Sequence, residues 1–347
     1  MTDESRRTIR RKKKRKLRKR AFFILIPLFV IFVGLSYATY LYVKADSVLS
    51  DSYQDDGREK SELRDTKVDP TEDNVSILIT GVDASDVRNN SDNARTDTLM
   101  LATLNKEDKS VKMLSIPRDS LVYIPEIGRE EKINHAHAYG GMDATIGTVE
   151  NLLDIPVDYY VKLNFEAFIE VVDAVNGIKA DVPYELYEQN SKDKERAIHL
   201  MPGEQKLNGE EALALARTRK LDNDIERGKR QQEIIKAVAN KAMSLNSILK
   251  YDDIIEAVGS NMTTNMTFGE MKSFISYGRA RDKLSFETYT LEGTDYQPGN
   301  AYYWQIDQTA LAETQQMLKE HLELGNTATA TEEDESPAAA GENTGSY

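Results

Sequence analysis

The chain has 347 residues and a hydrophobic content of 40%, which is enough for the core of one sizeable domain or two small ones. It contains no cysteine, so disulfides, cysteine nucleophiles and thiolate metal sites are excluded. The net charge of −13 is uneven, because residues 1–20 carry twelve Lys or Arg and two acids, a net of +10, and the rest of the chain carries −23.

Residues 21–43 contain no charged side chain across 23 positions. As a helix with a rise of about 1.5 Å per residue, this segment would span roughly 34 Å, enough to cross a bilayer core of about 30 Å. The cations lie on its N-terminal side, and Tyr37, Tyr40 and Tyr42 crowd its C-terminal end. The positive-inside rule then places residues 1–20 in the cytoplasm and the rest of the chain outside.

Two alternatives exist for this N-terminal region. A cleaved signal peptide usually has a shorter apolar core followed by small residues, whereas this core is long and leads into Tyr-Leu-Tyr-Val-Lys. The basic tail at residues 1–20 could bind nucleic acid, but beside an apolar segment it is better explained as a topology signal that touches anionic lipid. We therefore expect a single-pass membrane anchor and no nucleic-acid partner.

Beyond the anchor, the composition divides the chain into three parts. Residues 44–72 are polar and charge-dense, which is typical of a stalk. Residues 73–325 form the folded domain. Residues 326–347 are rich in Ala, Thr, Glu and Gly, which predicts a disordered tail.

Inside the domain, strands and helices are expected to alternate. The apolar patterns predict strands at Val75–Val82, Thr98–Leu104, Val111–Ile116, Tyr159–Leu163 and Phe286–Leu291. They predict helices at Asp143–Leu153, Phe165–Val175, Gly209–Ala216, Ile225–Met243, Phe268–Tyr277 and Asp307–Leu322. We expect an α/β fold with a central mixed sheet flanked by helices on both faces, preceded by one transmembrane helix.

Charged residues stand at the ends of the first three predicted strands. Asp83 follows the first, Arg95 and Asp97 precede the second, and Arg118 and Asp119 end the third. An isolated Arg-x-Asp is most often a salt bridge or a turn cap, but three such clusters would converge if the strands are neighbours.

Carboxylates that meet at one point repel unless a cation or a proton joins them. Asp97 and Asp119 would suit Mg²⁺ or Mn²⁺, since Mg²⁺ is usually held by one or two carboxylates and a substrate phosphate. The structural alternative is that the acids form hydrogen-bonded pairs with Arg95 and Arg118.

A second cationic group lies later in the chain. Arg217 and Arg219 close a run of small apolar residues, and if the chain becomes extended there, both side chains point the same way. Arg227, Arg230 and Gln231 follow at the start of the long predicted helix. Arginine binds phosphate bidentately, so this group predicts a diphosphate site, although solvated surface charge is the alternative.

Other hydrolytic sites are poorly supported. The sequence has no G-x-S-x-G motif for a serine hydrolase. His135 and His137 could ligate zinc, but the chain has four histidines and no H-E-x-x-H spacing, so packing or hydrogen bonding explains these two residues better.

The order of the motifs resembles the LytR-CpsA-Psr family across about residues 75–240. The motifs that carry the resemblance are ILITGVD, Arg95–Thr98, Ser115–Asp119, Lys132–Asn134 with Gly140–Gly141, Thr148–Leu153, Ile155–Tyr160, Leu207–Leu213, Arg217–Arg219 and Asp222–Gln232. Each motif is short, but in this order, after a basic tail and one apolar segment, the set is specific. Two departures are small: Val175-Asn176-Gly177 replaces a common double glycine, and an arginine often found just after the first Asp is displaced to Arg88.

The resemblance implies a Gram-positive phosphotransferase with an extracellular catalytic domain. Its donor would be an anionic glycopolymer, wall teichoic acid or a similar polymer, on a polyprenyl diphosphate carrier, and its acceptor would be peptidoglycan. The resemblance assigns the catalytic and metal acids to Asp83, Asp97 and Asp119. It assigns the diphosphate clamp to Arg95, Arg118, Arg217, Arg219 and Gln231, with Arg118 also in a catalytic role.

Three further points stay open in the sequence. The same site could hydrolyse the lipid diphosphate with water as acceptor, and a membrane-bound transcriptional attenuator is a third reading, which the charge rule opposes. Which Asp accepts the proton cannot be read from the residues. An apolar channel for the prenyl chain is predicted on faces of Phe165–Val175 and Ile234–Val238, although such stripes are usually core.

Overall fold

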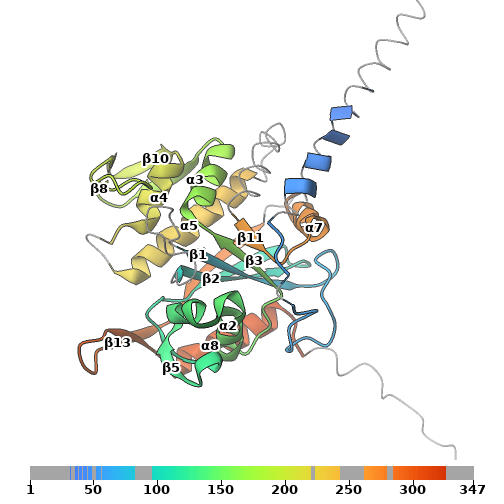
Figure 1. Ribbon diagram of the computed structural model, residues 1–347, viewed down its shortest axis with the longest axis vertical. Helices are drawn as coiled ribbons and strands as arrows, with labels where there is room; N and C mark the ends of the chain where they lie inside the picture. Colours follow the sequence, from blue (N-terminus) through green and yellow to red (C-terminus); the bar gives the residue numbers. More distant parts are fainter. Residues whose placement is uncertain are drawn as a thin grey trace, which may run out of the picture.

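The computed structural model describes residues 57–82, 96–219, 223–242, 262–279 and 284–325, together with scattered positions between 32 and 55. Figure 1 shows the domain around a central sheet, with one lobe above it and one layer of helices below. Asp83, Arg88 and Arg95 lie outside the described residues, as does most of the predicted transmembrane segment. Among the residues that the structure describes, no helix is both long and apolar enough to cross a membrane.

The central sheet has six strands in the order β11-β6-β1-β2-β3-β12. The neighbouring pairs β1/β2, β2/β3 and β6/β11 are antiparallel, while β1/β6 and β3/β12 are parallel, so the sheet is mixed, as predicted. The strands are β1 (Val75–Val82), β2 (Thr96–Asn105), β3 (Ser110–Ser115), β6 (Tyr159–Leu163), β11 (Met262–Thr264) and β12 (Ser285–Thr290).

The central strands are apolar at successive positions, and side chains alternate between the two faces of a sheet, so both faces are apolar. Leu78, Leu101 and Leu114 pack in the core shared with α2 (Ala136–Leu153) and α8 (Gln308–His321). Met100 and Met113 belong to the opposite core, against α5 (Asp224–Ala242) and α7 (Phe268–Arg279). The alternation therefore fixes the strand register between two helical layers.

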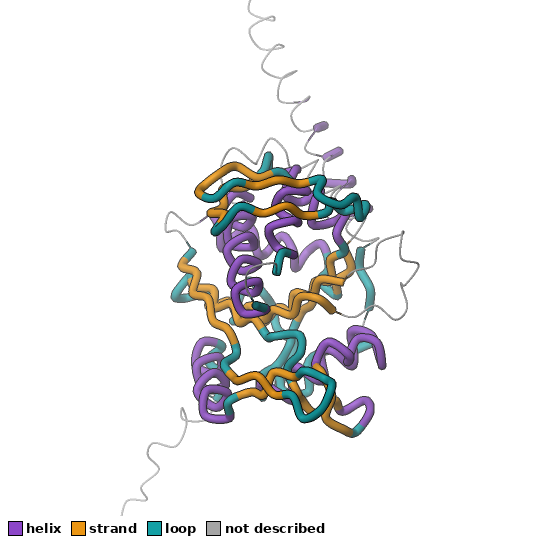
Figure 2. Tube along the Cα trace, turned by 90° about the vertical axis from the view of Figure 1, so that its left-hand side faces the viewer, coloured by secondary structure: helices purple, strands orange, loops and turns teal. Residues whose placement is uncertain are grey.

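The upper lobe packs α3 (Phe165–Ala174), α4 (Gly209–Arg217) and four short strands against α5 in a separate apolar cluster. Figure 2 shows these short strands and helices above the central sheet. Gly209 starts α4 where a Cβ would lie 2.4 Å from the carbonyl oxygen of Ile169, so this helix contact requires glycine. The short strands are β7 (Ile178–Val182), β8 (Leu186–Glu188), β9 (Ile198–Leu200) and β10 (Gly203–Leu207), paired as β7/β10 and β8/β9.

Two further hairpins belong to the lower layer. The first pairs β4 (Leu121–Ile124) with β5 (Arg129–Lys132), and the short 3-10 helices η1 (Pro125–Ile127) and η2 (Ile133–His135) flank β5. The second pairs β13 (Gly293–Tyr296) with β14 (Tyr303–Ile306). Figure 1 shows the second hairpin projecting from the body of the domain.

The structure confirms the mixed α/β fold and the strands and helices predicted within it. The predicted strand Val75–Val82 coincides with β1, and each predicted helix has a counterpart shifted by a few residues, except that α2 begins earlier, at Ala136. The extra turns of α2 contain Gly140 and Gly141, whose dihedral angles are not helical. This kink interrupts the helical pattern, so the sequence did not predict the earlier start. The proposed domain boundaries and the stalk stay predictions.

Candidate active site

A cavity of about 560 Å³ lies between the end of β1, the start of β2 and helices α3, α4 and α5. Four arginines line it, against the two carboxylates of Asp97 and Glu188. The rest of the lining is largely apolar. The four arginines are Arg118, Arg217, Arg219 and Arg227.

The topology explains why Asp97 and Arg118 meet. Because β2 and β3 are antiparallel, the start of β2 lies beside the end of β3, with Met100 opposite Ser115. Asp97 is the second residue of β2 and Arg118 follows β3, so their side chains converge. Arg118 Nη1 donates to Asp97 Oδ1 at 2.5 Å. The predicted convergence is confirmed for this pair.

Arg118 also contacts two other carboxylates. Its Nε lies 3.4 Å from Asp224 Oδ2 and 3.6 Å from Asp119 Oδ2. Burial alone would lower the pKa of Arg118, but the charges of Asp97, Asp224 and Asp119 outweigh it and raise the pKa above its ordinary value. Arg118 is therefore a permanent cation that holds three acids together.

Asp119 has a different environment from Asp97. Its Oδ1 accepts a hydrogen bond from Lys132 Nζ at 2.7 Å, and its side chain is 15% exposed. It does not line the cavity, whereas Asp97 lines it and is 38% exposed. The sequence placed both acids near Arg118, which is correct, but Asp97 alone of the two faces the cavity.

Arg217 and Arg219 reach the same cavity from the end of α4. The guanidinium carbon of Arg217 lies 4.4 Å from the centre of the Phe165 ring. The helix includes Arg217, and the chain becomes extended at Thr218, with φ −61° and ψ 139°, one residue later than the condition stated for the two arginines. The Arg219 side chain is 45% exposed, and its Nη1 lies 3.4 Å from Asp224 Oδ1. Arg219 is thus the accessible cation of the pair.

Asp224 joins the site although the sequence analysis did not name it as a site residue, and Arg227, which stood in the predicted cationic group, lies beside it. They stand three residues apart in the first turn of α5, with Arg227 Nη2 3.4 Å from Asp224 Oδ2. The Arg227 side chain is 7% exposed, and within the described ranges its Nε has no hydrogen-bond acceptor. Burial lowers the pKa of Arg227, opposed by Asp224 and aided by Arg118 and Arg219. The i, i+3 spacing was the signal in the sequence.

Gln231 and Arg230 have different roles. Gln231 Nε2 donates to the carbonyl of Ala216 at 3.1 Å, and Gln231 lines the cavity, while its contact with a diphosphate stays a prediction. Arg230 instead donates to the carbonyls of Leu215 and Thr218 at the end of α4, so it stabilises the helix terminus.

The apolar part of the lining contains some of the residues predicted for a lipid channel. Phe165 and Phe168 of α3 and Ile235 of α5 line the cavity. Val172 and Ile234, from the same predicted faces, are buried in the core of the upper lobe instead. The cavity therefore joins an arginine-rich surface to an apolar wall.

Metal binding can be tested against the carboxylates in place. In the part of the chain that the structure describes, no group of three or more His, Asp or Glu side chains could hold a metal ion. Asp97 fits a cation bound jointly with a phosphate ligand, because it is partly exposed in the cavity. Both oxygens of Asp119 face a cationic group, Lys132 on one side and Arg118 on the other, so Asp119 fits less well.

With arginines facing an apolar wall from α3 and α5, this fold and cavity are those of a class of protein suited to an anionic head group on an apolar chain. The family model described as the LytR_cpsA_psr family matches residues 39–320, and the chain belongs to that family.

Two curated relatives match over nearly their whole length. The chain is 40% identical over 320 residues to "Polyisoprenyl-teichoic acid--peptidoglycan teichoic acid transferase TagT" of Bacillus subtilis, covering 91% of this chain and 98% of the relative. It is 38% identical over 319 residues to the TagU transferase of Bacillus licheniformis, covering 90% and 99%.

Solved structures agree. "TagT bound to LIIa-WTA" has a TM-score of 0.68 and 39% identity, covering 78% of this chain and 98% of that one. The structure titled "LytR-CPS2A-psr family protein YwtF (TagT) with bound octaprenyl pyrophosphate lipid" has a TM-score of 0.63 and 37% identity, with coverage of 78% and 98%.

Proposed function

We propose that this protein is a membrane-anchored phosphotransferase that moves an anionic glycopolymer, wall teichoic acid or a similar polymer, from a polyprenyl diphosphate carrier to peptidoglycan. The observation that carries the proposal is that four arginines adjoin an apolar wall within one cavity. Arginines suit a diphosphate, and the apolar wall suits a prenyl chain. The transferase names of the relatives and the octaprenyl pyrophosphate and WTA in related structures support the same substrates.

The arrangement supports direct phosphoryl transfer. The oxygen of an acceptor sugar hydroxyl attacks the phosphorus nearer the glycopolymer. A phosphodiester forms, the bond to the bridging oxygen breaks, and prenyl monophosphate leaves. Arg118, Arg219 and Arg227 would stabilise the charge that develops on the breaking diphosphate. The hydroxyl proton passes to a carboxylate of the site, and Asp97 and Glu188 are the described acids that line the cavity.

We further propose that Mg²⁺ or Mn²⁺ binds together with the substrate, held by Asp97 and the diphosphate oxygens, with Asp119 and Asp83 as further carboxylates. The cation would neutralise negative charge on the phosphates. Chelator should therefore abolish activity, and added Mg²⁺ should restore it. Asp97→Asn keeps the shape of the side chain but removes a charge, so the Mg²⁺ concentration that gives half-maximal activity should rise while the melting temperature stays unchanged. Full activity of Asp97→Asn in excess chelator would contradict this proposal.

The reaction type can be tested with labelled lipid-diphosphate glycan, supplied with and without peptidoglycan oligomers. Transfer should join the label to the oligomers and release prenyl monophosphate. Without acceptor, water should enter slowly and give free phosphorylated glycan with the same lipid product. If label appears only as free glycan even with saturating acceptor, the protein is a lipid-diphosphate hydrolase instead.

A further inference from the structure

The β13–β14 hairpin carries four aromatic side chains within nine residues: Tyr296, Tyr302, Tyr303 and Trp304. Tyr296 and Tyr302 are 41% and 39% exposed. Tyr296 lies opposite Tyr303 across the hairpin, and their ring centres are 6.4 Å apart at 44°. The hairpin projects from the body of the domain in Figure 1. Trp304 packs against the main core, whereas Tyr296 and Tyr302 are the exposed rings of the hairpin.

This hairpin is fixed beside Asp119. The backbone N–H of Trp304 donates to the carbonyl oxygen of Asp119 at 2.8 Å. Lys132 Nζ lies 5.4 Å from the centre of the Tyr303 ring and 2.7 Å from Asp119 Oδ1, so one cation joins the aromatic surface to that acid. At Gly293, a Cβ would lie 2.3 Å from the carbonyl oxygen of Gln305, so the pairing is closely packed.

Tyr302 confirms how near the hairpin lies to the site. Its hydroxyl donates to Asp295 Oδ1 at 2.8 Å. Burial raises the pKa of Tyr302 well above its ordinary value, and the charges of Asp295, Asp119 and Asp224 raise it further. Asp119 and Asp224 are the acids that contact Arg118, so Tyr302 lies within their electrostatic field.

The charge of the hairpin selects between possible ligands. Residues 292–307 contain Glu292, Asp295 and Asp307 and no Lys or Arg. A cargo with a phosphate in every repeat would be repelled by this surface along its length, whereas a glycan strand presents uncharged ring faces to it. The tip also exposes the amides of Gln297 and Asn300, which can bond to hydroxyl and acetamido groups.

We propose that the β13–β14 hairpin is the acceptor subsite, on which the glycan strand of peptidoglycan lies. The faces of pyranose rings present C–H groups that pack against exposed tyrosine rings, and the hairpin holds them next to Asp119 and Arg118. This inference rests on the proposed transferase function. It assigns the donor to the cavity and the acceptor to the hairpin, so one sugar hydroxyl can reach the diphosphate between them.

The test uses the full-length protein in lipid nanodiscs, with uncrosslinked oligomers of alternating N-acetylglucosamine and N-acetylmuramic acid as the acceptor probe. Tyr296→Ala and Tyr302→Ala should each raise the acceptor KM about tenfold, the effect of losing one aromatic contact. The donor KM and the slow release of free glycan without acceptor should not change. Tyr302→Phe keeps the ring, so its acceptor KM should stay near wild type even though the bond to Asp295 is lost.

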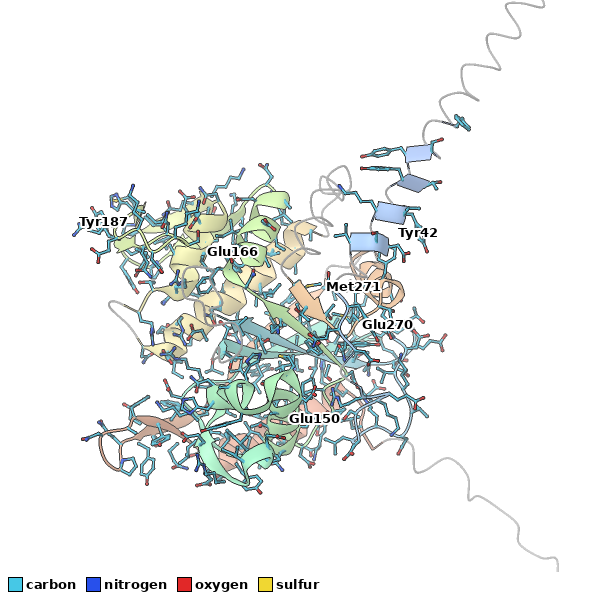
Figure 3. The ribbon with its side chains drawn as sticks, viewed as in Figure 1. Tyr42, Glu150, Glu166, Tyr187, Glu270 and Met271 are labelled. Carbon is cyan, nitrogen blue, oxygen red and sulfur yellow. The ribbon has the colours of Figure 1, made fainter. Side chains whose placement is uncertain are left out.

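The matched control is Tyr187→Ala on β8, whose ring stacks on His199 with centres 4.1 Å apart. Figure 3 labels Tyr187 in the upper lobe, well separated from the hairpin. Its removal should leave the acceptor KM unchanged. An unchanged acceptor KM in both hairpin variants would overturn the proposal, as would a raised donor KM, which would assign the hairpin to the cargo.

A direct binding measurement separates this inference from the proposed function. Calorimetric titration of the nanodisc protein with the same oligomers needs no turnover. If the wild type transfers nothing but binds oligomers, and Tyr296→Ala weakens that binding about tenfold, the hairpin is a glycan site and the transferase assignment fails. If the wild type transfers label and the hairpin variants bind oligomers as tightly as it does, the hairpin assignment fails alone.

Discussion

Arg118 holds together a set of acids that would otherwise repel one another. Asp97, Asp119 and Asp224 each lie within 3.6 Å of its guanidinium group. A bound diphosphate adds further negative charge, which the neighbouring Arg219 and Arg227 are placed to balance. The site is therefore preorganised, because folding rather than substrate binding orders these side chains.

Arg219 is the cation whose loss should affect binding more than folding, because its side chain is 45% exposed and its ion pair within the described ranges is a 3.4 Å contact with Asp224. Arg219→Lys keeps the charge but cannot place two N–H groups on two phosphate oxygens. We expect affinity for a short-chain prenyl diphosphate, measured by calorimetry, to fall by roughly 1.5–3 kcal/mol, with no change in melting temperature. Lys229→Ala, which removes a surface cation 56% exposed, is the control and should bind normally.

For individual residues, the sequence predicted the contacts between side chains better than the role of each side chain. The strand-end positions of Asp97 and Arg118 were enough, since antiparallel neighbours bring such positions together. The orientation of Asp119 toward Lys132 depends on the β4–β5 hairpin. The strands of this hairpin have little apolar periodicity, so the sequence did not predict them. The burial of Arg227 depends on packing between α5 and the sheet, which no local pattern specifies.

Among the secondary-structure elements, α8 is fastened to the sheet by a buried histidine. His321 Nδ1 and Nε2 lie 2.8 Å from the hydroxyl oxygens of Thr103 and Ser110, and Asn105 donates to the His321 carbonyl oxygen. This end of α8 is therefore held by polar contacts to β2 and β3, beside the leucines that bury its other face.

Burial lowers the pKa of His321 below its ordinary 6.5. As the pH falls below about 6.5, the unfolded chain takes up a proton at His321 and the folded chain does not. The free energy of unfolding therefore decreases as the pH decreases, by at most about 1.4 kcal/mol per pH unit for one proton. Urea unfolding at pH 7.5, 6.5 and 5.5 should show this loss, and His321→Gln should show a shallower dependence. Identical slopes would mean that His321 titrates alike in both states.

Among the secondary-structure elements, the long ones were predicted from the sequence and the short ones were not. Long apolar periodicities predicted β1, β6 and α4 within a residue or two. The strands β7 to β10 and the hairpins β4–β5 and β13–β14 are three to five residues long and mostly polar on one side, so their patterns are too short to separate from loops.

For the whole molecule, the segment before β1 is held against the domain by ion pairs and hydrogen bonds. Arg64 Nε and Nη2 bond to both oxygens of Asp158 at 2.9 and 2.7 Å, with side chains 13% and 1% exposed. Ser61 Oγ donates to Glu150 at 2.6 Å, on the side of the domain where Figure 3 labels that residue. Residues 57–72 are thus docked against the domain through buried acids.

Arg64→Ala should be strongly destabilising, because it leaves the buried carboxylate of Asp158 without its cation. We expect the free energy of unfolding to fall by about 3 kcal/mol. The matched control is Lys179→Ala, which removes an ion pair to Glu204 with side chains 78% and 69% exposed, and should change stability by about 0.5 kcal/mol or less. Equal effects of the two substitutions in urea unfolding would show that the docked segment contributes little.

The last prediction concerns the side of the membrane on which the domain lies. The twelve cations before residue 21 predict that residues 44–347 are outside, and a lipid-linked substrate would require the site to stay near the bilayer. The Tyr42 ring, at the end of the predicted transmembrane segment, lies 5.6 Å from the ring of Phe268 on α7, so α7 adjoins that end of the segment. Protease added to intact spheroplasts should digest the domain and leave an N-terminal tag protected, while a cytoplasmic marker stays whole. Protection of the domain until the membrane is permeabilised would reverse the topology, and with it the assignment to cell-wall transfer.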